Sequence, residues 1–265
     1  MVATSGRDSG DPGGIGQLIV RYRRVGSTME VASDLALQGA PHGTVVLADW
    51  QSAGRGRLGR SWSAAPGSSL LTSWIFRTSN DPETLSAVSP LISLAVARAI
   101  RRIAPEAPVA FKWPNDVLID GRKAAGILLI SRSSPEGMVV IAGIGVNLRA
   151  DAIPSGVEGS SISEWSPGIT TNRMLRQVSV SLGSAWNSFE QHRCLADMDL
   201  DAIHELMTWR GDVVTVTTGA DGVVGIATAI GSDGSLLLQV ENSPEITRLY
   251  VGEIVRGPRP ARSGG

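Results

Sequence analysis

The sequence predicts an α+β fold built on a mixed, mostly antiparallel sheet, with helices on one face and a small β-barrel at the C-terminal end. Several strand-like segments follow one another between residues 109 and 148 with only short turns between them, which favours antiparallel pairing. Residues 171–193 repeat apolar side chains at helical spacing. After residue 210 the chain becomes rich in β-branched residues and glycine, which is typical of a small barrel.

The first part of the chain alternates strands and helices. Strands are predicted by apolar and β-branched runs at residues 17–25, 44–50 and 69–76. A short helix separates the first two strands; either Ser27 or Thr28 offers its N-cap, and Gly39 closes it. Ser89 and Pro90 form an N-cap and first-position pair for the apolar helix that follows them.

The rest of the chain adds strands and two more helices. Strands are predicted at residues 109–114, 116–119, 123–131 and 138–148, and helices at residues 171–193 and 199–209. The first of these helices carries an apolar stripe formed by Leu175, Val178, Leu182 and Trp186. Hairpin signals at residues 220–222 and 232–234 then divide the C-terminal segment into about five strands, so we expect a closed barrel of SH3-like size.

These elements divide the chain into two ordered parts. We expect residues 17–208 to form the larger domain and residues 209–256 to form the barrel, with the boundary near residues 208–211. Residues 1–16 and 257–265 are predicted to be disordered ends.

Composition limits the classes of function. The 265 residues carry a net charge of −1, which gives no general attraction to nucleic acid or to an anionic membrane. The single cysteine, Cys194, excludes an internal disulfide and favours a reducing cytoplasm, and three widely spaced histidines disfavour a zinc site. Residues 1–16 lack the apolar core of a signal peptide, and we expect no apolar run of the ~18 residues that a membrane span needs.

Residues 54–59, Gly-Arg-Gly-Arg-Leu-Gly, match the G-x-G-x-x-G fingerprint of dinucleotide-binding proteins. That fingerprint requires a strand before the glycine turn and a helix after it, because the helix N-terminus binds the pyrophosphate. Here the loop leads through Pro66 into another strand, and bulky arginines occupy the positions where backbone must approach phosphate. NAD binding is therefore disfavoured.

The arginines of this loop indicate a different chemistry. Arg55, Arg57 and Arg60 offer permanently charged, fork-shaped donors for carboxylate and phosphate. On a glycine-hinged segment they predict a mobile anion clamp that orders over its ligand and excludes water. A solvated basic loop is the alternative.

A second unusual segment surrounds Pro114. Lys112, Asn115, Asp116 and Lys123 cluster there between apolar strands. Each of them alone would be an ordinary surface turn residue. Together, a carboxylate for Mg²⁺ and two lysines for phosphate or carboxylate predict a nucleotide site.

A third segment, Gly143-Ile-Gly-Val-Asn147, ends a strand that reads as buried. Gly143 and Gly145 leave room for a ligand against the backbone, and Asn147 supplies a polar group at the strand end.

Taken in order, GRGRLGRSW (54–62), KWPNDVLIDGRKAAGIL (112–128) and GIGVN (143–147) resemble the biotin–protein ligases. VGST (25–28) matches as well, although Met29 stands where the family usually has asparagine. The resemblance covers residues 18–256. It implies a mixed-sheet α+β catalytic domain of the class II synthetase and biotin–lipoate ligase type, followed by an SH3-like domain.

The resemblance implies a ligase that works in two half-reactions, with ATP, Mg²⁺ and biotin. The biotin carboxylate attacks the α-phosphate of MgATP, which gives biotinyl-5′-AMP and pyrophosphate. A lysine amine on the biotin carboxyl carrier domain of an acyl-CoA carboxylase then attacks this mixed anhydride. Because two anions must meet in the first step, positive charge is needed where they join.

The resemblance also implies residue roles. Lys123 is the central catalytic group between biotin carboxylate and α-phosphate, assisted by Arg55 and Arg57. Biotin contacts are implied for Ser27, Thr28, Gln51, Gly54, Arg55, Trp62, Lys123 and Gly126. Nucleotide contacts are implied for Arg57, Arg60, Lys112, Asn115, Asp116 and Asn147, with Asp116 as the Mg²⁺ ligand. Trp62 would cover the pocket once the loop orders; ordinary core packing is the alternative for this side chain.

Three other functions compete with this interpretation. A lipoate or octanoate ligase would share the fold but lacks this pairing of motifs. A biotin-sensing repressor would need a DNA-binding domain, and too few residues precede the first predicted strand for one, so we expect neither nucleic acid nor membrane as a partner. A binding module with an inactive partner domain is disfavoured by the intact Lys123 and Asp116. Whether the protein forms a homodimer, which carboxylase it serves and what the barrel does stay open.

Overall fold

The computed structural model describes residues 14–218, 221–241 and 243–256. Its larger sheet has the strand order β1-β2-β3-β7-β6-β5-β4. The strands are β1 (Ile19–Tyr22), β2 (Thr44–Ala48), β3 (Ser69–Thr78), β4 (Val109–Lys112), β5 (Asp116–Ile119), β6 (Arg122–Ser134) and β7 (Gly137–Asn147). β1 and β2 pair in parallel and every other neighbouring pair is antiparallel, which confirms the mixed, mostly antiparallel sheet.

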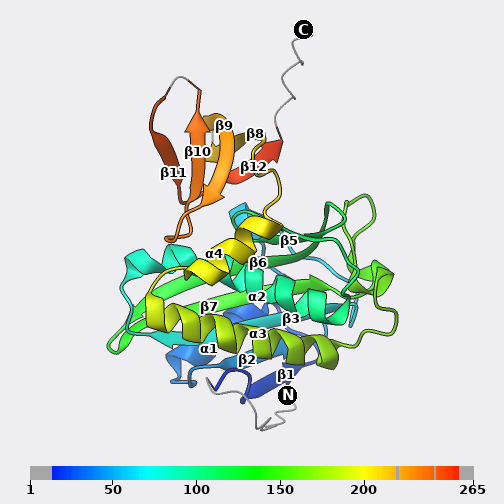
Figure 1. The fold of residues 1–265 in the computed structure, drawn as a ribbon. Coiled ribbons are helices and arrows are strands. Elements are labelled where there is room, and N and C mark those ends of the chain that lie inside the picture. The colour runs from blue at the N-terminus through cyan, green and yellow to red at the C-terminus, as the bar shows by residue number, and fades with distance from the viewer. Residues whose placement is uncertain (1–13, 219–220, 242, 257–265) are drawn as a thin grey trace.

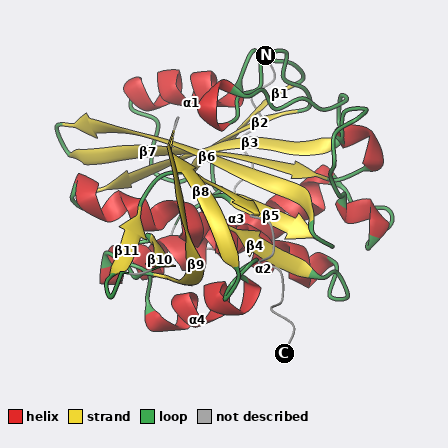
Figure 2. Ribbon diagram, turned by 90° about the horizontal axis from the view of Figure 1, so that it is seen from above, coloured by secondary structure: helices red, strands yellow, loops and turns green. Residues whose placement is uncertain are grey.

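Helices cover both faces of this sheet (Figures 1 and 2). They are α1 (Thr28–Leu37), α2 (Val88–Ile103), α3 (Thr171–His192) and α4 (Asp197–Leu206). α1 packs on one face and the other three lie on the opposite side. The prediction of helices on a single face is therefore wrong. The reason lies in strands that are apolar on both faces: on β7, Val139 and Ile141 pack toward α1, while Ile144 and Val146 belong to the core beneath α2 and α3.

The start of α1 resolves the choice between two capping residues. Ser27 is the N-cap, and its hydroxyl accepts a hydrogen bond from the Met29 amide at 3.3 Å. Thr28 is the first helical residue, and Gly39 follows the helix with φ of +84°. Ser27, Thr28 and Met29 are thereby fixed side by side over the central strands of the sheet, where Thr28 meets Ser73 of β3 and Met29 meets Gly143 of β7.

α2 begins earlier than predicted. It starts at Val88, directly after a 3-10 segment, η2 (Pro82–Ala87), and no side chain caps it. Pro82 is the proline at the start of the 3-10 segment. Pro90 instead lies inside the first turn of α2, where no backbone N–H is required. Ser89, the predicted cap, donates its hydroxyl proton to the Pro114 carbonyl at 2.9 Å instead.

The segment Pro82–Ile103 also corrects the expectation of no membrane-length apolar run. Among the described helices it is long and apolar enough to cross a membrane by length and composition, with a mean hydropathy of 1.3. Within the fold it is 67% buried, and α2 packs between the sheet and α3. Its apolar composition is thus that of a core helix. The predicted stripe of α3 is buried against it.

The C-terminal part of the chain forms a second, five-stranded antiparallel sheet, in the order β11-β10-β9-β8-β12. Its strands are β8 (Val213–Thr218), β9 (Asp221–Ile230), β10 (Leu236–Val240), β11 (Ile246–Leu249) and β12 (Glu253–Arg256). The five strands confirm an SH3-like arrangement, but the closed barrel is wrong because β11 and β12 remain unpaired edges. Leu236, Leu238 and Ile254 are buried, and they belong to one apolar cluster that is continuous with the core of the large sheet.

The second sheet stands on the larger body beside α4 (Figure 1). α4 ends at Leu206, three residues before its predicted end, and Trp209 and Gly211 then adopt positive φ. A domain division near residues 208–211 stays a proposal. Of the predicted disordered ends, residues 1–13 and 257–265 lie outside the described residues, whereas Ile15 is buried.

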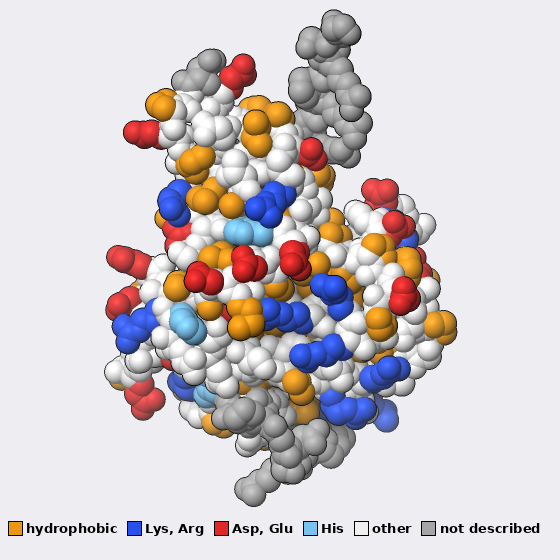
Figure 3. All heavy atoms as spheres, viewed as in Figure 1, with side chains coloured by type: hydrophobic (Ala, Val, Ile, Leu, Met, Phe, Trp, Pro, Cys, Tyr) orange, Lys and Arg blue, Asp and Glu red, His pale blue; other side chains and the backbone are white. Residues whose placement is uncertain are grey.

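Neither sign of charge dominates the face seen in Figure 3. Acidic side chains gather over α4, and basic side chains gather over α2 and α3 below it. Both signs therefore share this face, in keeping with the net charge of −1.

Candidate active site

A cavity of about 490 Å³ lies between the N-terminus of α1, the loop at residues 54–63 and the ends of β5, β6 and β7. The predicted site residues that line it are Ser27, Thr28, Gln51, Arg55, Arg57, Arg60, Trp62, Lys112, Asn115, Asp116, Lys123, Gly126 and Asn147. Gly54 alone among the predicted site residues does not line it. Segments far apart in the sequence thus converge on one hollow.

The floor of the cavity consists of strand glycines covered by two large side chains. A Cβ atom at Gly145 would lie 2.5 Å from the Trp62 ring, and one at Gly126 would lie 3.0 Å from it. A Cβ atom at Gly143 would lie 2.6 Å from the Met29 sulfur. The expectation that glycines leave open room is therefore corrected: Trp62 and Met29 occupy that room. The Trp62 indole N–H is buried without a hydrogen-bond partner among the described residues.

One end of the cavity has a connected polar group. The Gln51 side-chain oxygen accepts hydrogen bonds from the Thr28 amide at 2.8 Å and from the Thr28 hydroxyl at 3.0 Å. Ser73 donates to the same hydroxyl at 2.8 Å. Ser27 and Thr28 are buried, so this end offers fixed hydroxyl and amide groups to a polar ligand edge.

The other end has a charged centre. The Lys123 ammonium lies 2.7 Å from an Asp116 carboxylate oxygen and 5.7 Å from the centre of the Trp62 ring. The two residues meet because β5 and β6 form an antiparallel pair with a register shift beside Val117. Asp116 is mostly buried, so the cavity holds its central cation against an acid within reach of the arginine loop.

The arginine loop is folded down over this end. Hydrogen bonds from the Gly56 amide to Arg60 and from the Trp62 amide to Gly54 close it as a compact turn. A side chain at Gly54 would collide with the Trp62 carbonyl, so Gly54 serves the backbone of the turn. Gly54 therefore has a conformational role in this turn, and its contact with biotin stays a prediction.

The three arginines face different partners. Arg57 donates to the Asn115 side-chain oxygen at 2.9 Å and to the Gly252 carbonyl at 3.1 Å. Arg60 forms two hydrogen bonds with Glu253, at 3.1 and 2.6 Å. Arg55 pairs with Glu30 on α1. The loop therefore connects α1, the segment after β4 and the second sheet.

Electrostatics distinguish the three arginines. Burial lowers the pKa of Arg57 below its ordinary value, although the nearby acids Asp116 and Glu253 oppose that shift. The hydrogen bond to Glu253 raises the pKa of Arg60. The same bond, with the positive charges of Lys112 and Arg57, holds the pKa of Glu253 below its usual range. Arg57 is thus the arginine most enclosed in the cavity, and Glu253 is surrounded by cations.

Gly252 and Glu253 are site residues that the sequence reasoning missed. Glu253 begins β12 of the second sheet and lines the cavity, and Gly252 directly precedes that strand. An isolated glutamate at the start of a short strand has no local feature that marks it, and only the fold brings it to the loop. A second missed wall is the stretch from Ala152 to Gly159, which follows β7.

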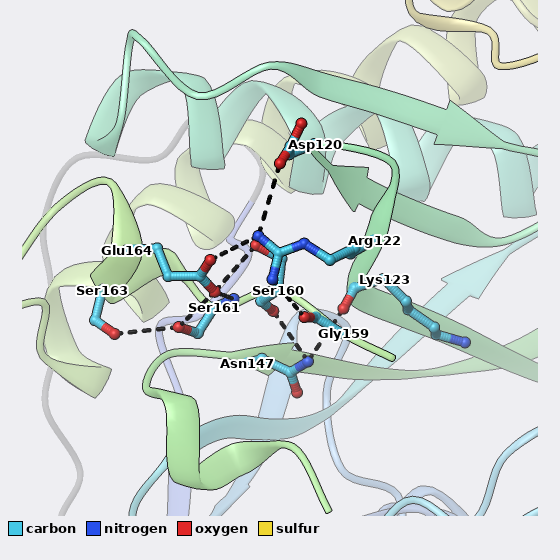
Figure 4. Close-up of polar contacts among 9 residues, drawn as sticks. All are labelled: Asp120, Arg122, Lys123, Asn147, Gly159, Ser160, Ser161, Ser163 and Glu164. Carbon is cyan, nitrogen blue, oxygen red and sulfur yellow. Dashed lines mark hydrogen bonds and ion pairs between the residues drawn. The ribbon is translucent and has the colours of Figure 1, made fainter. Parts of the chain in front are cut away.

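Asn147 braces the backbone around Lys123 (Figure 4). Its amide nitrogen donates to the Lys123 carbonyl at 3.3 Å and to the Ser160 carbonyl at 3.2 Å, and the Ser160 amide donates to the same Lys123 carbonyl at 2.9 Å. The Lys123 side chain extends away from this network. Asn147 lines the cavity as predicted, but its N–H bonds hold the strand in place and point to a positioning role.

A neighbouring ionic network fixes the same wall. Glu164 accepts from Arg122 at 2.7 Å and closes a capping box with Ser161. Burial raises the pKa of Glu164, but these hydrogen bonds outweigh burial and leave the pKa below its usual value. Arg122 also donates to the Gly159 carbonyl at 3.0 Å, which ties the cavity wall to β6.

The acids of the cavity fit a nucleotide-bound magnesium ion better than a protein metal cage. Within residues 14–218, 221–241 and 243–256 no group of three or more His, Cys, Asp or Glu side chains could hold a metal. Mg²⁺ that accompanies a nucleotide is commonly held by one or two carboxylates plus phosphate oxygens. The mostly buried Asp116, beside Lys123, is of that kind.

A comparison with known families identifies the class of protein that this fold and cavity define. The model of the Biotin/lipoate A/B protein ligase family matches residues 22–147. The Biotin--[acetyl-CoA-carboxylase] ligase of Mycobacterium tuberculosis is 30% identical over 208 residues, which are 75% of this chain and 74% of that protein. The chain belongs to the biotin–protein ligase family.

Other relatives agree with this assignment. The Bifunctional ligase/repressor BirA of Bacillus subtilis is 36% identical over 136 residues, 51% of this chain and 42% of that protein. The structure of the biotin protein ligase from Aquifex aeolicus in complex with biotin and ATP superposes with a TM-score of 0.73 at 25% identity, over 89% of this chain and 97% of that one. The chain spans about half the length of the first curated relatives it matches.

Proposed function

We propose that this protein activates biotin with MgATP to biotinyl-5′-AMP and transfers the biotinyl group to a lysine of a biotin carboxyl carrier domain. The observation that carries the proposal is Lys123, which is paired with Asp116 inside a cavity that has a polar end, an apolar floor and an arginine loop. Membership of the family and the named ligases among its relatives support it.

The polar end suits the ureido edge of biotin. Thr28 and Gln51 form a fixed donor and acceptor group, and Ser27 lies beside them. The Trp62 ring, which lies on the strand glycines, offers an apolar surface for the bicyclic ring. With the ureido edge at this end, the valerate chain would point the biotin carboxylate toward Lys123.

The charged end suits the reaction of two anions. In the first step a biotin carboxylate oxygen bonds to the α-phosphorus of ATP, and the bond to the β-phosphate oxygen breaks with loss of pyrophosphate. Lys123 would neutralise charge where the two anions join, and Arg57 would do so from the loop side. Asp116 would hold the Mg²⁺ ion, which supplies charge neutralisation at the phosphates when it is bound.

On binding, the substrates would replace the partners that the cationic side chains of the site already have in the structure. Lys123 is held by Asp116, and Arg57 by Asn115 and Gly252, so each cation is preformed near its working position. In the second step the amine of the acceptor lysine attacks the biotinyl carbonyl and AMP leaves. The folded loop covers the anhydride and limits its loss to water.

The remaining parts of the proposal concern selectivity and location. Lipoate ligation is not favoured, because the named relatives are biotin ligases. A carrier domain of an acyl-CoA carboxylase is the proposed acceptor. A cytoplasmic location is supported by the single cysteine, Cys194, which forms no disulfide.

One measurement tests the activity directly. The protein is incubated with biotin, MgATP and a purified carrier domain, and the carrier is weighed by mass spectrometry. We expect a gain of one biotinyl group on one lysine. Lipoate in place of biotin serves as the matched control. An unmodified carrier, together with no biotin-dependent ATP–pyrophosphate exchange, would refute the proposal.

A further inference from the structure

Two cavities lie along the same face of the large sheet. Besides the active-site cavity, a second cavity of about 580 Å³ lies under the C-terminal half of α1. Its lining includes Ser33 and Ala36 from α1, Ile130 and Arg132 from β6, and Val139 and Ile141 from β7. Both cavities are therefore bounded by the same three elements.

The two cavities are separated by one turn of α1 and by two residues along each of the strands β6 and β7. Met29 lines the active-site cavity and Ser33, one turn further along α1, lines the second. On β7, Gly143 lines the active-site cavity and Ile141 lines the second cavity. On β6, Leu128 lines the active-site cavity and Ile130 lines the second cavity. The strand register pairs Leu128 with Gly143 and Ile130 with Ile141.

Met29 fills this boundary. Its side chain is 6% exposed and packs in a buried cluster with Val139 and Ile141. Gly143 gives it room, because a Cβ atom there would lie 2.6 Å from its sulfur and 3.1 Å from its Cγ. The thioether thus lies over β7 between Ile141, which lines the second cavity, and Gly143, which belongs to the floor of the active-site cavity.

We propose that Met29 determines acid specificity by closing the inner end of the active-site cavity and so limiting the length of the acid that binds. The ligand class is a carboxylic acid whose carboxylate lies at Lys123 and whose far end reaches Met29. This inference rests on the proposed function for the site. Met29→Ala removes Cγ, Sδ and Cε, and would connect the two cavities.

The magnitude follows from the burial of methylene groups. Each methylene moved from water into an apolar cavity improves binding about fourfold. The room vacated by three heavy atoms admits about two methylenes, so the preference for decanoic over octanoic acid should rise about tenfold or more. Met29→Leu, which nearly conserves side-chain volume, should leave the ratio near that of the wild type.

The test measures binding of biotin, octanoic acid and decanoic acid by calorimetry, with biotin added as competitor to confirm the site. The wild type, Met29→Ala and Met29→Leu are compared, and thermal unfolding checks that each variant is folded. Leu37→Ala is the matched control, because Leu37 lines the second cavity about two helical turns beyond Met29, away from the boundary. We expect the tenfold shift toward decanoic acid in Met29→Ala alone.

Two outcomes separate this inference from the proposed function. An unchanged acid preference in folded Met29→Ala, or an equal shift in Leu37→Ala, overturns the role of Met29 whatever the enzyme does. Absence of biotin binding and biotin-dependent exchange in the wild type overturns the proposed function, and a preserved shift between the two fatty acids would still assign the boundary to Met29.

Discussion

Arg60 and Glu253 are joined by two hydrogen bonds, although 193 positions of the chain separate them. Arg60 belongs to the active-site loop, and Glu253 begins the last strand of the second sheet. Beside this pair, Arg57 donates to the carbonyl of Gly252. The second sheet is therefore part of the wall that holds the arginine loop over the cavity.

Glu253→Gln should loosen the loop with little effect on global stability. Both partners are partly exposed, at 58% for Arg60 and 33% for Glu253, so the pair contributes at most about 1 kcal/mol to unfolding. We expect faster tryptic cleavage after Arg55 and Arg57 and a several-fold higher KM for ATP. Glu245→Gln, which removes an exposed acid of the same sheet, is the control and should leave both unchanged. Equal cleavage rates in the two variants would contradict a holding role for Glu253.

Loop attachment should weaken in acid. The hydrogen bond from Arg60 lowers the pKa of Glu253 in the folded protein. A depressed carboxyl pKa gives stabilisation that is complete above the unfolded value of about 4.3 and is lost as pH falls through the folded value. The difference in unfolding free energy between wild type and Glu253→Gln should thus be constant from neutral pH to about pH 5, decline below about pH 4.3, and vanish once pH has fallen through the lowered pKa of Glu253. Urea titrations across this range measure it, and a difference that grows in acid would reverse the assigned sign.

Lys123→Ala should remove adenylation while the protein still folds. Lys123 is 41% exposed, so its loss costs little stability, whereas one preorganised charge at the reacting centre typically contributes about 10²–10³ in rate. Biotin-dependent pyrophosphate exchange measures the loss, and far-UV circular dichroism checks the fold. The matched variant is Lys112→Ala, because Lys112 and Lys123 are the only lysines in the sequence and both line the cavity. Turnover like that of the wild type in Lys123→Ala would remove this residue from the centre.

Residues at strand and helix ends could be predicted because local sequence marks them. Ser27 caps helix α1 and Thr28 begins it, and Asp116 and Lys123 lie on either side of the turn between β5 and β6, so the local sequence indicates polar groups on a rigid frame. Their convergence needed the order of the motifs and the resemblance to a family. The alternation of β7 between two cores also follows from its period of two, once both faces are known to be covered.

Contacts between distant elements could not be predicted from local pattern. Glu253 has no distinguishing neighbours, and its partner Arg60 lies at the other end of the chain. The glycines of the cavity floor read as space for a ligand, but the side chains of Met29 and Trp62, each from another element, fill that space. The open second sheet also escaped prediction, because local strand and turn signals do not show whether the edge strands β11 and β12 pair with each other.

The tip of the hairpin between β9 and β10 fixes the second sheet to the site. The indole N–H of Trp113, next to Lys112, donates to the Gly234 carbonyl at 3.1 Å. Ser86, just before α2, donates to the Asp233 carbonyl at 2.6 Å. Gly234 has φ of +82°, and a Cβ atom there would lie 2.5 Å from the Ser86 carbonyl oxygen. Backbone from both parts of the protein meets at this glycine with no room for a side chain.

Gly234→Ala should therefore separate the second sheet from the loop it holds. Gly211→Ala is the matched control, since Gly211 has the same φ of +82° and no described atom lies within 4 Å of the place where its methyl group would stand. Both variants bear the strain of a left-handed alanine, about 1–2 kcal/mol, but only Gly234→Ala adds a collision with backbone that cannot rotate away. We expect the larger loss of unfolding free energy in Gly234→Ala, with a raised KM for ATP and an unchanged affinity for biotin, because Trp113 adjoins the nucleotide end. Denaturant unfolding, exchange kinetics and biotin calorimetry on the two variants decide it. Equal losses would mean that the collision is absorbed and that the hairpin tip does not position the site.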